Sequence, residues 1–391
     1  MIKSILDNDL YKFSMQQAVH MLYPRAEVEY EFINRNREKT RFPDGFGCQV
    51  QKEIDKMASL QLFDDEKGFL AETCYFLTPV YLDYLATYRF DPAEVSVSQA
   101  GGDLSIIVKG PWYRTILWEV PLLAIVSELF YVMTQAKPEP AEQQHATNLH
   151  KARVLAENGI KYADFGTRRR FSSKLHKALI LDLLNEKQST LIGTSNVHLA
   201  RHFNIKPIGT LAHEWFMFHA VLRGYQMANP SAIEAWVNVF HGNLGIALPD
   251  TFTTDLFLST FDTLYAKLFD GVRHDSGDPF VFVDKIVNHY EKLHIDPMSK
   301  TIVFSDSLDI EKAVAIHNFC RGKVKDSYGI GTNLTNDVGV DPLNIVIKLA
   351  RCRAGADKPW YNTIKLSDDK GKYTGDPEEI AYCKALLKRG C

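Results

Sequence analysis

The stretch GVRHDSGDPFVFVDKIVNHYEKLHIDPMSKTIVFSDSLD, residues 271–309, contains two short apolar runs separated by a segment of helical character. Within that segment Ile286, Tyr290 and Leu293 fall on one face of a helix. Polar residues follow each apolar run at once, as RHDSGDP and as SDSLD. A strand that is followed by a helix and then by a second strand is typical of parallel pairing. This stretch therefore predicts an α/β fold with functional residues at the strand ends.

The same alternation extends through the chain from about residue 160 onward. Further apolar runs beside segments with helical spacing are YADF (162–165), STLIG (189–193), KPIG (206–209), LGIAL (244–248), YGIG (328–331) and NIVIKL (344–349). Seven strand ends carry polar signatures, which are DFGTRRR (164–170), GTSN (193–196), GTLAHEW (209–215), PDT (249–251), RHDSGDP (273–279), SDSLD (305–309) and GIGTN (329–333). An open doubly wound sheet concentrates its site at one switch point, whereas a barrel gathers all strand-end loops around one mouth. We therefore predict an irregular α/β barrel.

The N-terminal third of the chain has a mixed pattern. Strand-like runs occur at 28–32, 96–99 and 104–108, and a helical pattern at 117–133. The stretch QAKPEPAEQQ (135–144) is the clearest break in composition. We predict a mixed α+β N-terminal domain over residues 1–134, open to recruiting C-terminal residues, and an irregular α/β barrel domain over residues 135–391 with a C-terminal helical extension.

Composition excludes several classes of protein. The 391 residues include 45 Lys and Arg against 48 Asp and Glu, so the net charge of −3 offers no general positive field for nucleic acid. The longest apolar run, 120–133, contains Pro121 and Glu128 and is shorter than the ~20 residues that a membrane span needs. Asp7 and Asp9 interrupt the place where a secretory peptide would be apolar. We expect a cytoplasmic protein that binds neither nucleic acid nor membrane.

The strand-end loops predict a phosphate-binding site. GTSN, GTLA, SDSLD and GIGTN place small residues, hydroxyls and accessible backbone N–H groups before predicted helices. Helix capping explains any one of these loops equally well, but four on one face favour phosphate binding. The chain has no G-x-x-x-x-G-K-[ST] motif and no G-x-G-x-x-G after a strand. Any nucleotide must therefore bind without those two standard motifs.

A few charged residues are candidates for chemistry. Arg168 and Arg273 follow apolar runs and could bind a carboxylate or a phosphate with two hydrogen bonds. Asp278 precedes a proline and is explained as a helix N-cap, whereas Asp275 has no such structural explanation. His213 lies at a predicted strand-to-helix junction. We predict that Arg273, Asp275 and His213 are catalytic.

Seven blocks in order resemble the nicotinate phosphoribosyltransferase family and span most of the chain. They are DLYKFSM (9–15), DFGTRR (164–169), GTSNVHLA (193–200), GTLAHEW (209–215), RHDSGDP (273–279), FSDSLD (304–309) and GIGTNLTND (329–337). The resemblance implies the type II phosphoribosyltransferase fold. It also implies NAD salvage chemistry in which nicotinate, 5-phosphoribosyl 1-pyrophosphate, ATP and water give nicotinate mononucleotide, pyrophosphate, ADP and phosphate.

The resemblance also implies roles for individual residues. It makes His213 the residue that ATP phosphorylates transiently, with Mg²⁺ as the cofactor and ATP as a co-substrate. It implies that the pyridine ring contacts Tyr11 and Phe165, and that its carboxylate and the phosphates contact Arg168 and Arg273. It also implies that ribose and Mg²⁺ contact Asp275 and Asp306. The implied contacts of the ribose 5-phosphate are Gly331 and Thr332. Relatives often share a site across a homodimer, and in that case Tyr11 would come from the partner chain.

Ser195 bears on the choice of base. A related enzyme of the same fold that uses nicotinamide carries Asp at this position, and a carboxylate there would repel the carboxylate of nicotinate. Ser195 therefore points to nicotinate. The alternatives are nicotinamide or quinolinate as the base, or a barrel-fold binding protein without turnover. A nucleic-acid binder that uses the arginine cluster is disfavoured by the net charge of −3.

Overall fold

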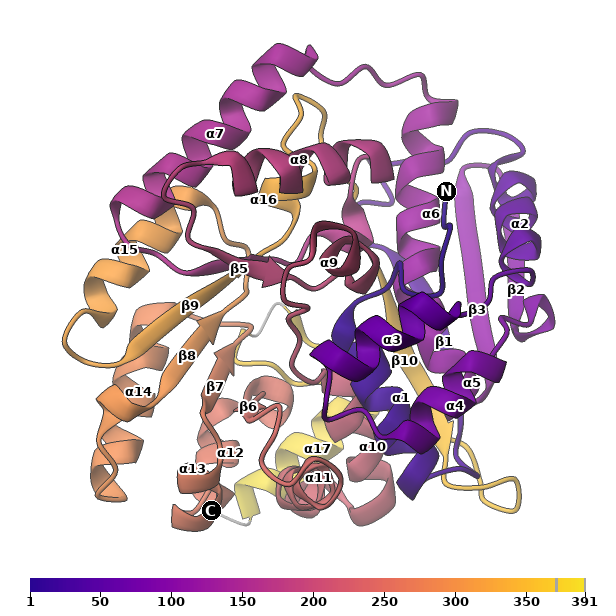
Figure 1. Cartoon of the computed structure of the whole chain (residues 1–391). Helices are drawn as coiled ribbons and strands as arrows, with labels where there is room; N and C mark the ends of the chain where they lie inside the picture. The colour runs from indigo at the N-terminus through magenta and orange to yellow at the C-terminus, as the bar shows by residue number, and fades with distance from the viewer. Residues whose placement is uncertain (370–371, 390–391) are drawn as a thin grey trace.

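The computed structural model describes residues 1–369 and 372–389, which form two sheets side by side (Figure 1). One sheet has five strands in the order β11-β10-β1-β3-β2. The other has six strands in the order β5-β4-β9-β8-β7-β6. Helices cover both sheets, and the two sheets meet along a region lined by loops.

The six-stranded sheet contains the predicted strand and helix units. Every neighbouring pair in it is parallel. Its strands are β4 (Tyr162–Asp164), β5 (Leu191–Thr194), β6 (Ile246–Ala247), β7 (Gly271–His274), β8 (Thr301–Phe304) and β9 (Lys325–Ile330). The carboxyl ends of parallel strands lie at the same edge of the sheet, so the polar loops that follow them gather on one side. The predicted α/β class is confirmed.

The run KPIG at 206–209 does not form the predicted strand. Only Pro207 makes an isolated bridge, to Thr194 of β5. A proline has no N–H to give to a ladder, so a continuous strand is disfavoured there. Gly193 permits the close approach of this segment, because a Cβ at Gly193 would lie 2.0 Å from the carbonyl oxygen of Lys206.

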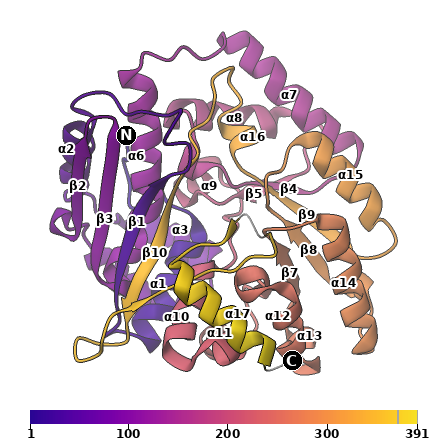
Figure 2. The ribbon, with the colours of Figure 1, turned by 180° about the vertical axis from the view of Figure 1, so that it is seen from behind.

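The five-stranded sheet combines both ends of the chain. The predicted N-terminal strands are present as β1 (Glu27–Asn34), β2 (Val95–Ala100) and β3 (Asp103–Pro111). The run NIVIKL, which we grouped with the parallel strands, instead belongs to β10 (Ile345–Arg353), which pairs antiparallel with β1 (Figure 2). Strand β11 (Tyr361–Asn362) follows at the edge. Residues of β10 are alternately buried and partly exposed over most of its length, as expected where one face of an antiparallel sheet is covered.

The helices of the N-terminal part are α1 (Leu10–Leu22), α2 (Phe46–Met57), α3 (Asp64–Thr73), α4 (Pro79–Thr87), α5 (Trp112–Thr115), α6 (Glu119–Met133) and α7 (Ala141–Glu157). Residues 112–133 are long and apolar enough to cross a membrane by length and composition, but 78% of the apolar 18-residue window within them is buried inside the protein. Helix α6 packs against α2 and β10. It is therefore a core helix of the fold.

The remaining helices surround the parallel sheet. They are α8 (Ser173–Asn185), α9 (Val197–Phe203), α10 (His213–Arg223), α11 (Tyr225–Phe240), α12 (Thr254–Thr260), α13 (Thr263–Leu268), α14 (Pro279–Lys292), α15 (Ile310–Cys320), α16 (Thr332–Thr335) and α17 (Pro377–Arg389). The carboxylate of Asp278 accepts hydrogen bonds from two backbone N–H groups at the start of α14, so its predicted capping role is confirmed. Helix α17 packs against α11, at the back of the view in Figure 1 and the front of Figure 2.

Short 3-10 turns complete the described elements at Pro92–Glu94 (η1), Ile116–Trp118 (η2), Thr167–Arg169 (η3), Asp250–Phe252 (η4) and Pro297–Ser299 (η5). Two of them matter for the site. Turn η3 follows β4 and carries Arg168 and Arg169, and turn η4 follows β6. Both lie at the carboxyl ends of parallel strands, where ligands bind in α/β proteins.

Candidate functional site

A cavity of about 780 Å³ lies between the strand-end loops of the parallel sheet and strands β1 and β10. Every predicted site residue except Ser195 lines it. These lining residues are Tyr11, Phe165, Arg168, His213, Arg273, Asp275, Asp306, Gly331 and Thr332. The parallel order of the strands explains the gathering, because carboxyl ends that are distant in sequence then lie at the same side of the sheet.

Two aromatic rings, Tyr11 and Phe165, enter the cavity from different elements. Tyr11 is in the first turn of α1, and Phe165 directly follows β4. A glycine packs closely against each residue, against the backbone of Tyr11 and against the ring of Phe165. A Cβ at Gly209 would lie 2.9 Å from the backbone nitrogen of Tyr11, and a Cβ at Gly329 would lie 2.4 Å from the ring of Phe165. Close packing therefore requires glycine at both positions. Tyr11 lines the cavity of its own chain, and the homodimer stays a prediction.

Ser195 lies behind the cavity. It is 4% exposed, and its hydroxyl donates to Asp9 Oδ1 at 2.8 Å. The other oxygen of Asp9 is 3.6 Å from Nε of Arg168, which lines the cavity. One route by which Ser195 can influence the bound base therefore runs through Asp9 and Arg168. We predicted a contact between this serine and the base, but Ser195 does not line the cavity. Its effect on the choice of base stays a prediction.

The arginine cluster at 168–170 divides between site and scaffold. Arg168 keeps 38% of its side chain exposed to the cavity region, whereas the side chain of Arg170 is 1% exposed. Arg170 is held by ion pairs of 2.8 Å to Asp7 and 2.8 Å to Glu128. Buried charges need such partners, so Arg170 has a structural explanation. Of these three arginines, Arg168 and Arg169 line the cavity.

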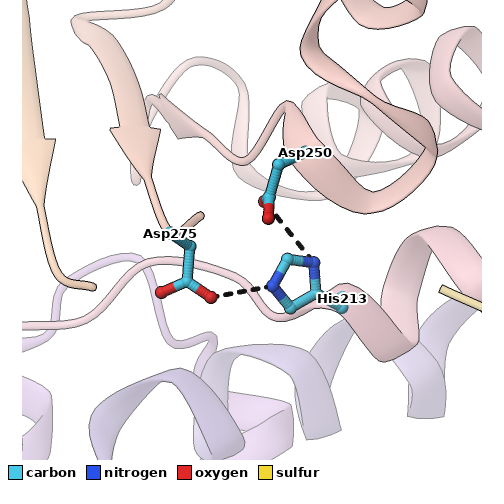
Figure 3. Close-up of side chains that lie close together, drawn as sticks. All are labelled: His213, Asp250 and Asp275. Carbon is cyan, nitrogen blue, oxygen red and sulfur yellow. Dashed lines mark hydrogen bonds and ion pairs between the residues drawn. The ribbon is translucent and has the colours of Figure 1, made fainter. Parts of the chain in front are cut away.

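His213 begins α10 and has partners on both ring nitrogens (Figure 3). Its Nε2 lies 2.9 Å from Asp275 Oδ2 and 2.9 Å from Lys365 Nζ. Its Nδ1 lies 3.0 Å from Thr251 Oγ1 and 3.7 Å from Asp250 Oδ1. A single ring nitrogen cannot donate to Asp275 and accept from Lys365 at once, so these two contacts are alternatives set by the tautomer.

The electrostatics of this group favour a neutral imidazole. Burial and the Lys365 ammonium lower the pKa of His213. Burial raises the pKa of Asp275, but Arg273 and His213 outweigh it and hold that pKa well below its usual value. Both pKa values are lowered, so at neutral pH the carboxylate of Asp275 is ionised and the imidazole of His213 is uncharged. A neutral imidazole has one nitrogen with a free lone pair, as a nucleophile requires.

His213, Asp250 and Asp275 offer ligand atoms that all lie within 4.8 Å of one another. Figure 3 shows that the two carboxylates approach opposite nitrogens of the ring, so they do not converge on one point beside it. Lys365 Nζ lies 2.9 Å from His213 Nε2 and 3.2 Å from Asp250 Oδ2. The Lys365 ammonium therefore supplies the positive charge within this group.

The other predicted charged residues are held by partners. Arg273 donates to Asp275 at 2.7 Å, to Ser305 at 2.7 Å and to Thr210 at 3.2 Å. The three bonds use different nitrogens of the guanidinium, so its plane is fixed. Asp306 receives Lys372 Nζ on both carboxylate oxygens, each at 2.7 Å. Arg273 is thus preorganised for binding an anion.

Among the residues that the structure describes, sequence reasoning missed four cations that line the same cavity. They are Arg35, Lys348, Lys365 and Lys372. Burial, with Arg35 and Lys365 nearby, lowers the pKa of the Lys348 ammonium to about 7. None of the four belongs to a strand-end motif, and lysines in a sequence usually indicate solvent-exposed positions. The one available signal was a lysine inside the apolar run NIVIKL.

Comparison with known proteins was consistent along the whole chain. Residues 6–127 match the model of the nicotinate phosphoribosyltransferase N-terminal domain, and residues 160–390 match that of the nicotinate phosphoribosyltransferase family. Nicotinate phosphoribosyltransferase of Desulforapulum autotrophicum is 68% identical over 390 residues, covering 100% of both chains. The enzyme of the same name from Chromohalobacter salexigens is 49% identical and covers 99% of this chain and 98% of its own length.

Solved structures give the same result. The crystal structure of nicotinate phosphoribosyltransferase from Porphyromonas gingivalis has a TM-score of 0.97 and 46% identity, and covers 99% of this chain and 100% of that one. The structure of the protein of that name from Vibrio cholerae has a TM-score of 0.91 and 38% identity, with coverage of 99% and 94%. The chain therefore belongs to the nicotinate phosphoribosyltransferase family.

Proposed function

We propose that the chain catalyses ATP-coupled transfer of a phosphoribosyl group to nicotinate in NAD salvage. Nicotinate, 5-phosphoribosyl 1-pyrophosphate, ATP and water give nicotinate mononucleotide, pyrophosphate, ADP and phosphate. Family membership supports the transfer reaction. The observation that carries the ATP coupling is His213, an uncharged imidazole at the cavity whose Nε2 lies 2.9 Å from both Asp275 Oδ2 and Lys365 Nζ.

The transfer step needs positioning and charge stabilisation. The pyridine nitrogen attacks C1 of the ribose while the C1–pyrophosphate bond breaks, so the reaction requires no protein nucleophile toward carbon. Tyr11 and Phe165 would hold the ring, and the Arg168 guanidinium would bind its carboxylate. Positive charge develops at the ribose and negative charge on the leaving pyrophosphate. The cavity offers carboxylates for the first and lysines for the second.

The coupling step is a phosphoryl transfer to His213. The ring nitrogen that lacks a proton attacks the γ-phosphorus of ATP, the bond to the β–γ bridging oxygen breaks, and ADP leaves. With the proton on Nδ1, Thr251 Oγ1 accepts it at 3.0 Å and Asp250 stabilises the positive ring. Water later hydrolyses the phosphohistidine and releases phosphate. Coupling requires that the phosphorylated and free enzyme bind substrates or products with different affinities.

The donor set at the cavity fits Mg²⁺. Asp275 and Asp306 supply the hard carboxylate oxygens that this ion prefers. Both carboxylates already have protein partners. We therefore expect them to contact a Mg²⁺ that enters the cavity bound to substrate phosphates. When bound, the ion would neutralise charge on the phosphates and the leaving pyrophosphate. Gly331 and Thr332 line the cavity where they could bind the ribose 5-phosphate.

A substrate panel tests the proposal. Pyrophosphate release is measured with 5-phosphoribosyl 1-pyrophosphate and Mg²⁺ and with nicotinate, nicotinamide or quinolinate, each with and without ATP. We expect release with nicotinate, stimulated by ATP. Release that depends on nicotinamide or quinolinate instead would overturn the choice of base, and no release with any base would favour a binding protein. Turnover that ATP does not affect would remove the coupling but keep the transfer.

A further inference from the structure

A row of alternating charges connects the base side of the cavity with the helix that carries His213. Neighbouring groups in this row have opposite sign, and all five come from different elements or junctions. In order they are Asp9, Arg168, Glu119, Lys12 and Glu214. The reaction described above uses only Arg168 from this row. The row therefore contains buried charges that still need an explanation.

Glu119 is the central member and has three partners. One carboxylate oxygen lies 2.5 Å from Lys12 Nζ and accepts from the Tyr11 hydroxyl at 3.3 Å. The other oxygen accepts from the guanidinium of Arg168 at 3.5 Å. Glu119 begins α6, whereas its partners come from α1 and from turn η3. One side chain thus links the two residues that we assign to the ring and the carboxylate of the base.

Lys12 holds Glu119 in place. Its ammonium is fully buried and also lies 2.7 Å from Glu214 Oε1. A buried ammonium must stay paired, so the position of the Glu119 carboxylate is strongly constrained. Burial raises the pKa of Glu119, but Lys12 and Arg168 outweigh that effect and bring it below its usual value. The carboxylate is therefore ionised and can direct two donors.

The contacts to Arg168 are longer than the contacts to Lys12. Arg168 is 3.5 Å from Glu119 and 3.6 Å from Asp9, at two different nitrogens. The guanidinium is thus oriented from two sides without being fully occupied, and its remaining N–H groups stay available for a carboxylate. Its carbon lies 5.9 Å from the centre of the Tyr11 ring, which stacks the cation against the aromatic face.

We propose that Glu119 is a positioning residue for the base: anchored by Lys12, it aims the guanidinium of Arg168 at the carboxylate of the pyridine and holds the ring of Tyr11 beside the pyridine ring. This inference rests on the proposed function. It predicts that Glu119 acts on the recognition of nicotinate and leaves the reaction of ATP with His213 unaffected, because none of its contacts reaches the imidazole.

The chain provides a matched control in Glu128. This residue lies on the same helix, α6, and its carboxylate holds Arg170, two positions after Arg168, at 2.8 Å. Both pairs therefore join α6 to the segment that follows β4. The Glu128 pair is buried away from the cavity lining, whereas Glu119 lines the cavity. A purely structural role of such pairs would give both variants the same kinetic result.

Glu119→Gln and Glu128→Gln are compared in the full-length protein. Glu119→Gln keeps the shape of the side chain and leaves Lys12 paired with Glu214, so we expect a folded protein. We expect its KM for nicotinate to rise about tenfold or more, with a smaller change in kcat and with ATP hydrolysis in the absence of base retained. For Glu128→Gln we expect a lower Tm and an unchanged KM.

Tyr11→Phe provides an independent measurement, because it removes only the hydroxyl that donates to Glu119. We expect a rise in KM of about threefold. An unchanged KM in Glu119→Gln, or an equal rise in Glu128→Gln, overturns the inference. If Glu119→Gln does not fold, an unchanged KM in Tyr11→Phe overturns it. Failure of the wild-type protein to use nicotinate would instead overturn the proposed function.

Discussion

The two walls of the cavity are built on different principles. In the barrel wall, formed by His213, Arg273, Asp275 and Asp306, the charged side chains pair with groups of opposite sign, Arg273 with Asp275 and Asp306 with Lys372. The sheet wall, formed by Arg35 and Lys348, brings like charges together, and this proximity helps to lower the pKa of Lys348. A wall of paired charges is rigid before substrate arrives. In a wall of like charges, the binding of an anion reduces the repulsion between the cations. The cavity thus combines a preorganised reacting side with a side suited to polyphosphate.

We expect the largest effect on the barrel wall from the substitution His213→Asn. Since the amide cannot accept a phosphoryl group, we expect ATP hydrolysis and ATP stimulation to fall by about 10³-fold or more, while slow ATP-independent transfer persists. Labelling with ATP that carries a tagged γ-phosphate should give an acid-labile, base-stable adduct on the wild-type protein only. Label that persists in the variant, or that maps to His198, His219 or His274, would contradict the role of His213.

Arg273→Lys asks whether the rigidity of the barrel wall matters beyond its charge. Lysine keeps the charge but cannot reproduce the three directed bonds to Asp275, Ser305 and Thr210. We expect kcat/KM to fall by about 10²-fold, with a higher KM for nicotinate or 5-phosphoribosyl 1-pyrophosphate. Steady-state kinetics with each substrate varied separately provide the measurement. Unchanged kinetics would show that the charge alone suffices.

Ser195→Asp tests the region behind the barrel wall. The new carboxylate would face Asp9 in a buried site, and the pair would compete for Arg168. We expect kcat/KM for nicotinate to fall by about tenfold or more, together with a lower Tm. Ser195→Ala is the control, because it removes one hydrogen bond without adding charge. If Ser195→Asp retains wild-type kinetics, Ser195 has no influence on the base.

The pH dependence of substrate binding tests the role of Lys348 in the sheet wall. Its pKa is lowered to about 7, so the ammonium form that binds phosphate is lost as the pH rises through that value. We expect the KM for 5-phosphoribosyl 1-pyrophosphate to increase several-fold between about pH 6 and about pH 8 in the wild-type protein. Lys348→Arg, which keeps its charge, should flatten this increase. A wild-type KM that does not depend on pH would argue against Lys348 as a phosphate ligand.

Prediction from sequence succeeded where local patterns are decisive. Each parallel strand is an apolar run followed by a turn and a helix, so the strand-end residues could be recognised one by one. It failed at NIVIKL, because an apolar run predicts a strand but says nothing about its partner. It also placed Ser195 in direct contact with the base, although the serine is buried and does not line the cavity.

The sequence by itself determined the strand and helix units, the polar strand ends and most residues of the barrel wall, because these depend on neighbours a few positions apart. Only the tertiary structure decided which charges meet. Strand β10 pairs with β1, which lies more than three hundred residues earlier in the sequence, and this pairing places Lys348 at the cavity. Lys12, Glu119 and Glu214 become one ion-paired group in the same way. Charge pairing depends on distance in space and on burial, and neither is encoded in any local pattern.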